Sequence, residues 1–212
     1  FYGIFAFLSA SALSIVIFKL AAHTRSISTL LIVGIAVSSF LGAFTSFAVY
    51  LIGEDSFRIT AWMMGYLGGA NWQKIALLLP PLLFCMAYFY AKRHELNIIL
   101  NGDEEAKSLG LNVERSKKSL LIVSSLIIGF SVAFTGMIGF VGLIIPHTLR
   151  MALHTASNAV LIPASALTGG VFLVFCDVIA KNALSPVEIP IGVVTSFFGA
   201  PFFLYLAFRK HA

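Results

Sequence analysis

Few residues in this chain have both the type and the spacing that chemistry requires. Asp177 and Lys181 lie one helical turn apart inside an apolar stretch, so their side chains can pair and lower the cost of placing charge there. A structural ion pair is the favoured interpretation, and a substrate or proton site is the alternative. His147 follows a proline, but no second histidine or carboxylate stands at ligand spacing, so no metal site is predicted.

The two cysteines, Cys85 and Cys176, each lie inside an apolar run without the CxxC or Cys/His spacing of a redox or metal site. We interpret both as small buried hydrophobic side chains. The sequence also lacks the phosphate-binding pattern GxxxxGK[ST] and the catalytic patterns HExxH and GxSxG. No catalytic residue is therefore predicted, and any hydrolysis of ATP is expected to come from another polypeptide.

The composition indicates a membrane protein. Of the 212 residues, 59% are hydrophobic and 11% are charged, whereas a soluble domain carries roughly 25% charged residues. The mean hydropathy is +0.96. The formal net charge of +5 does not indicate a nucleic-acid partner, because the basic residues flank apolar stretches. We expect an all-α fold: a polytopic transmembrane helical bundle that forms one domain over residues 1–212 and is surrounded by membrane lipid.

About seven apolar stretches approach the ~20 residues that a membrane-spanning helix needs. They cover 1–20, 30–52, 75–91, 119–135, 140–153, 160–180 and 191–208. The first stretch begins without methionine and has no basic residue before it, so we expect a fragment of a longer protein, not a signal peptide followed by a mature chain. Pro80 and Pro81 are expected to bend the third helix or to start it anew.

Basic residues gather at alternate ends of these stretches, and this bias predicts the orientation. Cationic residues are retained on the cytoplasmic side of membrane proteins. The residues assigned to the cytoplasmic side, which includes the C-terminus, are Lys19, Arg25, Lys92, Arg93, Lys107, Arg115, Lys117, Lys118, Arg150, Arg209 and Lys210. Those assigned to the outer side are Arg58, Lys74 and Lys181.

The one substantial polar segment, 92–118, is expected to contain a short helix. The Asp103 carboxylate is expected to cap this helix, and Glu104 and Glu105 suit the positive end of its dipole. Gly110 is expected to end it. A short helix held by spans on both sides can dock in a groove of a soluble partner, and a solvated loop is the alternative.

Four sequences resemble the FecCD-type permease family of ABC importers, which carry iron-siderophore, haem or cobalamin. Residues 136–150, GMIGFVGLIIPHTLR, resemble the family's GPIGFVGLIVPHIxR, with Met137 in place of the usual proline. Residues 188–206, EIPIGVVTSFFGAPFFLYL, resemble its last helix, and 96–115, LNIILNGDEEAKSLGLNVER, resemble its cytoplasmic coupling loop, with Asn101 where an apolar residue is more common. Together with 32–46, IVGIAVSSFLGAFTS, these matches occur in family order.

The resemblance implies a permease fold of about ten helices, of which this chain supplies about seven, in the cytoplasmic membrane of a prokaryote. It implies three kinds of partner: two ABC ATPase subunits, a second permease copy and an extracytoplasmic substrate-binding protein. ATP and Mg²⁺ would be bound by the ATPases, and this chain itself would bind no cofactor. Transport would proceed by ATP-driven alternating access.

Candidate site residues follow from this resemblance and from the small residues of the spans, which leave room for a bulky ligand. The residues expected to couple to the ATPase are Asp103, Glu104, Glu105, Ala106, Ser108, Leu109 and Gly110. The pathway or gating candidates are Gly34, Ser38, Ser39, Gly42, Gly139, Gly142, Pro146, Thr195, Gly199 and Pro201. The candidates for docking the binding protein are Arg58 and Glu188.

Several alternatives stay open. The glycines and the proline of 136–150 predict a bend beside the pathway, and a structural kink between adjacent spans is equally compatible with them. A permease for free metal ions would need histidines and carboxylates facing a pore, which the spans almost lack. An intramembrane enzyme would have only Asp177 and Lys181 as a catalytic pair. A structural subunit without transport activity is the remaining alternative.

Overall fold

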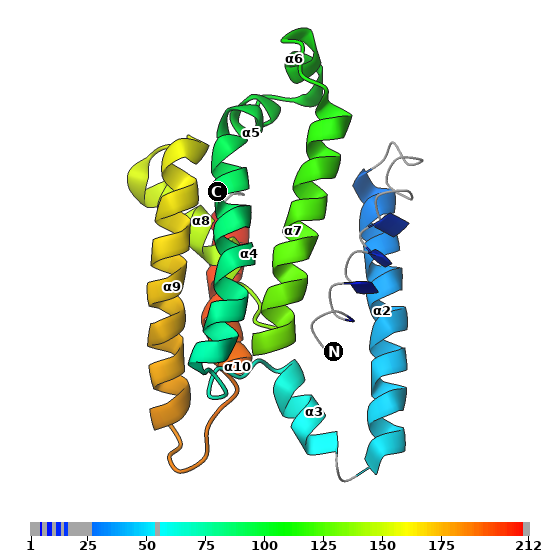
Figure 1. Ribbon diagram of the computed structural model, residues 1–212, viewed down its shortest axis with the longest axis vertical. Coiled ribbons are helices and arrows are strands. Elements are labelled where there is room, and N and C mark those ends of the chain that lie inside the picture. The colour runs from blue at the N-terminus through cyan, green and yellow to red at the C-terminus, as the bar shows by residue number, and fades with distance from the viewer. Residues whose placement is uncertain are drawn as a thin grey trace.

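The computed structural model describes residues 5, 8–9, 12–13, 15–16, 27–53 and 56–209. Every regular element among these residues is a helix, which confirms the predicted all-α class (Figure 1). The elements are α2 (Ile27–Ile52), α3 (Ser56–Met63), α4 (Trp72–Ala91), α5 (Arg93–Ile99), α6 (Asp103–Ser108), α7 (Val113–Thr135), α8 (Val141–Leu153), α9 (Asn158–Asn182) and α10 (Ile191–Arg209).

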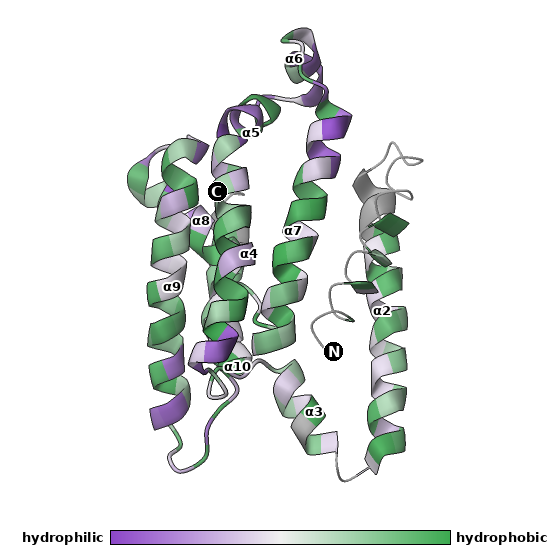
Figure 2. Cartoon of the chain, viewed as in Figure 1, coloured by the Kyte–Doolittle hydropathy of each residue, from purple (hydrophilic) through white to green (hydrophobic). Residues whose placement is uncertain are grey.

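Apolar helices form the body of the bundle. Four of them are long and apolar enough to cross a membrane: α4, α7, α9 and the Ile32–Ile52 part of α2. α8 and the Ile191–Leu206 part of α10 are shorter apolar helices. The middle of the bundle is mostly hydrophobic, whereas hydrophilic residues lie at its two ends: around α5, α6 and the start of α7 at one end, and at the start of α4 and the end of α9 at the other (Figure 2). Six predicted spans are thus confirmed as helices, and the stretch 1–20 lies largely outside the described residues.

The helix directions bring the basic residues of the polar segment and of the helix ends beside it to the end of the bundle that carries α6 (Figure 1). Lys92 and Arg93 follow α4, Lys117 and Lys118 lie in the first turns of α7, and Arg150 lies in the last turn of α8. Lys74 and Lys181 lie at the opposite end. The predicted grouping of these residues is confirmed, while the membrane face that each end occupies stays a prediction.

α4 passes through two consecutive prolines without a break. Pro80 and Pro81 both lie inside the helix, so the prediction that they start it anew is wrong. Proline removes a helical hydrogen bond, but spanning helices tolerate it because neighbouring helices and small local adjustments satisfy the freed backbone groups. α4 packs along both α7 and α9. Its start at Trp72 is fixed by the Asn71 side chain, which accepts a hydrogen bond from the Lys74 N–H (2.8 Å).

Three segments meet at one end of the bundle in what we call the glycine junction, defined by Gly65, Gly136 and Gly192. It joins the end of α3, the end of α7 and the start of α10 through backbone hydrogen bonds. These run from the Tyr66 N–H to the Thr135 carbonyl (2.9 Å), from the Ile191 N–H to the Gly65 carbonyl (3.1 Å) and from the Gly192 N–H to the Met64 carbonyl (3.0 Å). The backbone groups that lack partners at these helix ends are therefore satisfied by one another.

The close approach at the junction requires glycine. Gly136 has φ +69°, a conformation that other residues rarely adopt. A Cβ atom at Gly136 would overlap the Trp62 carbonyl oxygen, and one at Gly192 would overlap the Met64 carbonyl oxygen. Neither oxygen can move freely, because each belongs to the backbone. The glycines therefore set how closely α3 approaches the ends of α7 and α10.

The chain between α7 and α8 is not helical, and the break lies before Pro146, which stays inside α8. Phe140, at the end of this segment, adopts φ +67°, which costs a side-chain-bearing residue roughly 1–2 kcal/mol. Its ring packs directly on Gly199 of α10, where a Cβ would overlap it, and lies 6.2 Å from the Phe203 ring. This packing offsets the cost and fixes the start of α8 against α10.

α8 is too short to cross a bilayer alone. Its 13 residues rise about 20 Å, whereas the hydrocarbon core is about 30 Å thick. The non-helical residues 136–140 extend the same segment toward α7. Such backbone is tolerated at membrane depth only where protein or water surrounds it, and Gly136 is buried against α3.

A compact cluster of buried side chains joins α9 to α10. It contains Cys176, Ala180, Ile191 and Val194, all at most 6% exposed. Cys85, 1% exposed, lies on α4, and its Sγ is 3.8 Å from the Val123 carbonyl oxygen of α7. The prediction that both cysteines are buried hydrophobic residues is confirmed.

Replacing Gly192 by alanine is expected to destabilise the protein by about 1–3 kcal/mol, because the new methyl group meets the Met64 carbonyl in a close-packed site. Thermal unfolding in detergent measures this change. Gly170→Ala is the matched control, since Gly170 is also helical and has open space around its Cβ position. Equal melting temperatures for the two variants would contradict the proposed packing.

Candidate functional site

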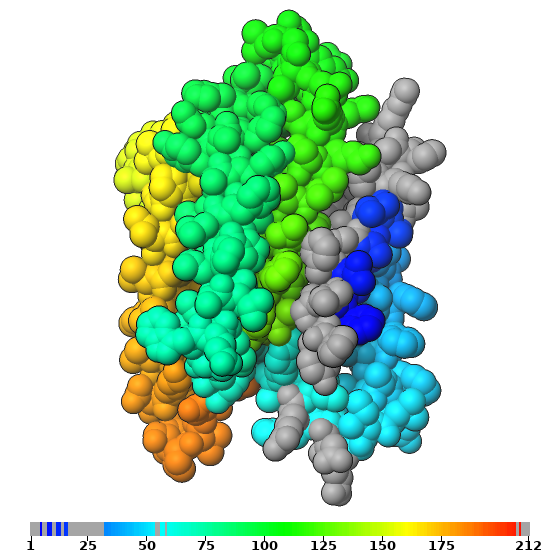
Figure 3. Space-filling model, viewed as in Figure 1, coloured from blue at the N-terminus to red at the C-terminus, as the bar shows by residue number. Residues whose placement is uncertain are grey.

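A polar segment projects beyond the apolar part of the bundle. α7 begins at Val113, earlier than the predicted 119, so the segment between the spans is 92–112, which we call the arm. The arm contains α5 and α6, and α6 forms its tip (Figure 1; Figure 3). The short helix predicted in this region is confirmed as α6, whereas α5 was not predicted.

The start of α6 differs from the prediction. Gly102, with φ +124°, occupies the N-cap position, and no side chain caps the helix. Asp103 is the first helical residue, and its two carboxylate oxygens accept from the Lys117 Nζ of α7 (2.7 and 2.5 Å). The prediction of an Asp103 cap is wrong, because this carboxylate binds a lysine on the following helix instead.

The end of α6 agrees with the prediction. Gly110 has φ +83°, and its N–H donates to the Lys107 carbonyl (2.9 Å). The Leu111 N–H donates to the Ala106 carbonyl (3.1 Å). This pair of bonds is the Schellman arrangement, in which glycine ends a helix in a left-handed conformation. Ala106 is fully buried, so the terminal turn is held tightly.

Three acidic residues, the basic Lys107 and one apolar residue are exposed on α6 and its C-cap. Glu104 and Glu105 are exposed, and Leu109 is 70% exposed. Ser108 donates from its Oγ to the Glu105 carbonyl (2.7 Å), so its hydroxyl is already used within the helix. A tip that offers carboxylates beside an exposed leucine can bind a partner surface that has basic residues around an apolar groove.

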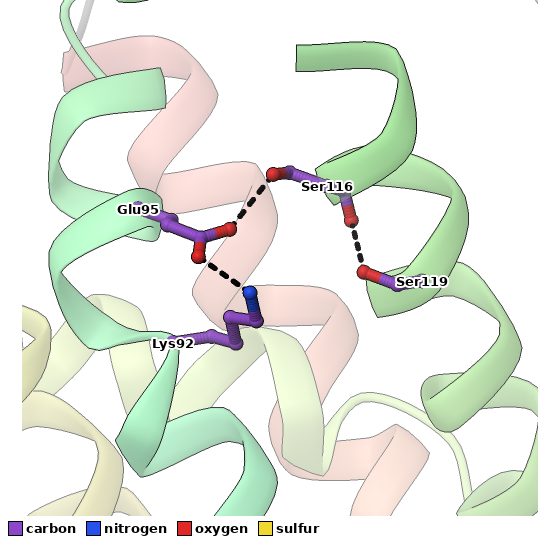
Figure 4. A network of polar contacts seen from close by, with 4 residues as sticks. All are labelled: Lys92, Glu95, Ser116 and Ser119. Carbon is purple, nitrogen blue, oxygen red and sulfur yellow. Dashed lines mark hydrogen bonds and ion pairs between the residues drawn. The ribbon is translucent and has the colours of Figure 1, made fainter. Parts of the chain in front are cut away.

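The turn between α4 and α5 is braced by an ion pair. Lys92 is the single residue between the two helices, and its Nζ lies 2.5 Å from the Glu95 Oε1. The other oxygen of Glu95 accepts from the Ser116 Oγ of α7 (2.7 Å), and the Ser116 carbonyl accepts from the Ser119 Oγ (2.9 Å) (Figure 4). Glu95 therefore connects the α4–α5 turn to α7.

The environment of Glu95 favours its charged form. Burial opposes ionisation, but the hydrogen bonds from Lys92 and Ser116 and the charge of Lys92 outweigh it, so the pKa of the Glu95 carboxyl lies below its ordinary value. The hydrogen bond to Glu95 likewise raises the pKa of the Lys92 amine. A lowered carboxyl pKa stabilises the fold above the ordinary pKa of about 4.3, and this contribution is lost only as the pH falls through the lower folded value.

A second contact ties α5 to α9. The Asn97 Oδ1 accepts from the backbone N–H of Asn158 (2.9 Å) and from its Nδ2 (2.8 Å). Asn158 is the first residue of α9, and the side chain of Ser157, its N-cap, makes no capping bond. Asn97 thus satisfies one of the free N–H groups of α9 from a different helix.

A cavity of about 300 Å³ lies beside this contact, between α4, α5, α8 and α9. Most of its lining is apolar, and Arg150, Asn158 and Ser165 contribute polar groups. Pro146 is the one pathway candidate that lines it. The remaining pathway candidates lie elsewhere in the bundle.

The pathway candidates do not converge on one described surface. On α2, Ser38, Ser39 and Gly42 are exposed and Gly34 is half-buried; Gly139 and Gly142 are exposed near the start of α8, and Pro201 is exposed on α10. In contrast, Thr195 is fully buried, donating to the Gly192 carbonyl (3.2 Å), and Gly199 is covered by Phe140. The pathway assignment stays a prediction for all of these residues.

The docking candidates lie at the end of the bundle opposite α6. Glu188 is exposed in the turn between α9 and α10, and Arg58 lies in α3. Asp177 and Lys181 form the predicted ion pair nearby (2.6 Å). Among the described residues, no group of three or more His, Cys, Asp or Glu side chains is placed to hold a metal ion.

The contacts that hold the arm were largely missed from the sequence. The spacing of Lys92 and Glu95, three residues apart, could have indicated their ion pair. The bonds from Glu95 to Ser116 and from Asn97 to Asn158 join residues 21 and 61 positions apart, and no local sequence pattern predicts such contacts.

Asn97→Ala is expected to free the start of α9 and cost about 1 kcal/mol, the usual effect of losing a helix cap. Faster hydrogen exchange of the backbone amides at 158–161 would show it. Asn101→Ala is the matched control, because Asn101 is exposed in the same arm and makes no side-chain bond that the structure records. Equal exchange in the two variants would contradict the cap.

Comparisons with known proteins agree with this architecture. The chain is 44% identical over 184 residues to the cobalamin import system permease protein BtuC of Halobacterium salinarum, covering 87% of this chain and 49% of the relative. It is 36% identical over 211 residues to the hemin transport system permease protein HmuU of Yersinia pestis, covering 97% and 62%. The chain therefore spans about half to three-fifths of the length of these relatives.

A solved structure, described as a metal-chelate type ABC transporter in an inward-facing conformation, superimposes with a TM-score of 0.81 at 30% identity, covering 92% of this chain and 63% of the other. The model of the FecCD transport family matches residues 1–209. With its apolar spans, this chain is a multi-pass membrane protein, and it belongs to the FecCD transport family.

Proposed function

We propose that this chain forms part of a permease subunit in an ABC importer that receives iron-siderophore, haem or cobalamin from a binding protein. The observation that carries the proposal is the family match over residues 1–209. The names of the relatives, which refer to cobalamin, hemin and a metal chelate, support a bulky chelate as the substrate class. Two ABC ATPase subunits would bind ATP and Mg²⁺, and this chain would bind no cofactor.

The arm is the proposed contact with the ATPase. Its tip, α6, extends beyond the spans, and its outer surface carries Glu104, Glu105 and Leu109. Basic residues surround the base of the arm, which supports a cytoplasmic location for this end. The C-terminal end of α10 lies at the same end of the bundle, so the C-terminus would also be cytoplasmic.

The opposite end would face the binding protein, with Arg58 and Glu188 as docking candidates. A second permease copy would complete the translocation pathway, and the small residues of α2 and α10 are the candidates for lining it. The membrane-spanning window of α2 has no buried residue, so this helix has surface available for lipid, for the rest of a longer chain or for the second copy. Alternating access would follow when the ATPases draw together and move the two arms.

Gly110→Pro tests the coupling role. Proline cannot adopt φ +83° and lacks the N–H that binds the Lys107 carbonyl, so the end of α6 should unwind and stimulated ATP hydrolysis should fall about tenfold or more. Gly110→Ala keeps the N–H and only strains the left-handed conformation by about 1 kcal/mol, so its loss should be smaller. Gly170→Ala, in the middle of α9, is the control.

The measurement uses the full-length permease with its ATPase, reconstituted in liposomes with binding proteins loaded with ferric siderophore, haem or cobalamin. Stimulation and uptake with one loaded binding protein would support the importer function and name its substrate. An assembled complex that neither hydrolyses ATP in response to any of them nor imports a chelate would refute the function and favour a structural subunit.

A further inference from the structure

We propose that Glu95 is a positioning residue that fixes the angle between the arm and α7, so that movement of α6 reaches the spanning helices. This inference rests on the proposed function and assigns a role to a residue outside the predicted coupling set. Glu95 is bonded on both sides: one carboxylate oxygen binds Lys92 at the α4–α5 turn, and the other binds Ser116 on α7 (Figure 4).

The α4–α5 turn is the point at which the arm leaves α4. Lys92 alone separates the two helices, with φ −85° and ψ 7°, so rotation about one residue's backbone bonds would redirect α5 and everything beyond it. The ion pair from Lys92 to Glu95 bridges this turn. Its side chains are 34% and 26% exposed, which shields the pair from solvent more than a fully exposed surface pair, whose contribution is small.

The bond between Glu95 and Ser116 fixes the position of the α4–α5 turn relative to α7. Ser116 is 7% exposed and lies in the first turn of α7, which is a membrane-spanning helix. A hydrogen bond to a charged acceptor is about twice as strong as one between neutral groups. The lowered pKa of the Glu95 carboxyl agrees with a charged acceptor in this bond.

Two other contacts hold the arm independently of Glu95. Asp103 binds Lys117, which fastens α6 to α7, and Asn97 binds Asn158, which fastens α5 to α9. A variant that lacks the Glu95 contacts should therefore fold and keep its arm attached, while the α4–α5 turn loses its direct link to α7. Loss of the Glu95 contacts should leave the arm in place but weaken the transmission of its movement to α7.

Four variants separate these contacts. Glu95→Ala removes both bonds, whereas Glu95→Gln keeps an oxygen acceptor for Ser116 and loses the charge that binds Lys92. Ser116→Ala removes only the bond to α7. Glu114→Gln is the matched control, because Glu114 is an exposed carboxylate on the first turn of α7 for which the structure records no ion pair among the described residues.

The quantity to measure is the amount of substrate imported per ATP hydrolysed, in liposomes that hold the full-length permease, its ATPase and its loaded binding protein. Glu95→Ala and Ser116→Ala should lower this ratio about two- to thirtyfold, the range that mutations of coupling residues produce. ATP hydrolysis should continue near the wild-type rate. Glu95→Gln should give an intermediate ratio, and Glu114→Gln should match the wild type.

A distance measurement tests the same idea without transport. Spin labels at His94 on α5 and Lys118 on α7, both exposed, should give a narrow distance distribution that broadens in Glu95→Ala and stays narrow in Glu114→Gln. If Glu95→Ala keeps both the wild-type ratio and the narrow distribution, the Glu95 role is wrong while the importer function stands. A parallel fall in assembly, hydrolysis and import, at a constant ratio, would also overturn it. If the wild-type complex imports nothing, the importer function and the Glu95 role fail together.

Discussion

The constraint on which the rest of this structure depends is that backbone N–H and C=O groups inside a membrane must be satisfied by the protein itself. Helices satisfy this constraint along their length, but their ends do not. At the glycine junction, α3 and α7 end and α10 begins, and each supplies the partner that another lacks. The exchange is possible only where backbones approach closely, and therefore only where Gly136 and Gly192 carry no side chain.

Much of the helical body could be predicted, because the hydropathy of a spanning helix is a local property of the sequence. α2, α4, α8, α9 and α10 begin and end within three residues of the predicted stretches. Gly110 ends α6 because a glycine after a short helix is itself a local signal. The ion pair of Asp177 and Lys181 was equally accessible, since it needs only helical spacing.

The remaining features depend on contacts between distant residues. The sequence around Asp103 fits a helix cap, yet its carboxylate binds Lys117. Whether this carboxylate caps α6 or binds the lysine depends on the position of α7, which the local sequence does not show. Pro80 and Pro81 would interrupt a helix in water, but α4 lies between α7 and α9 and continues. Phe140 adopts a left-handed conformation because Gly199, 59 positions later, leaves space for its ring. In each case tertiary packing overrides the local preference.

α7 is the element that connects the two organised ends of the molecule. Its last residue, Thr135, accepts a hydrogen bond at the glycine junction, and its first turns hold the arm through Ser116 and Lys117. Its 23 residues give a rise of about 35 Å, so it separates a close-packed junction from an arm whose contacts with α7 are made by side chains. The close backbone contacts leave the junction little freedom to move, whereas the side-chain bonds between the arm and α7 can shift. In the proposed importer, a force on α6 would therefore tilt α7 about the junction. The size of that tilt would depend on how firmly Glu95 connects the α4–α5 turn to α7.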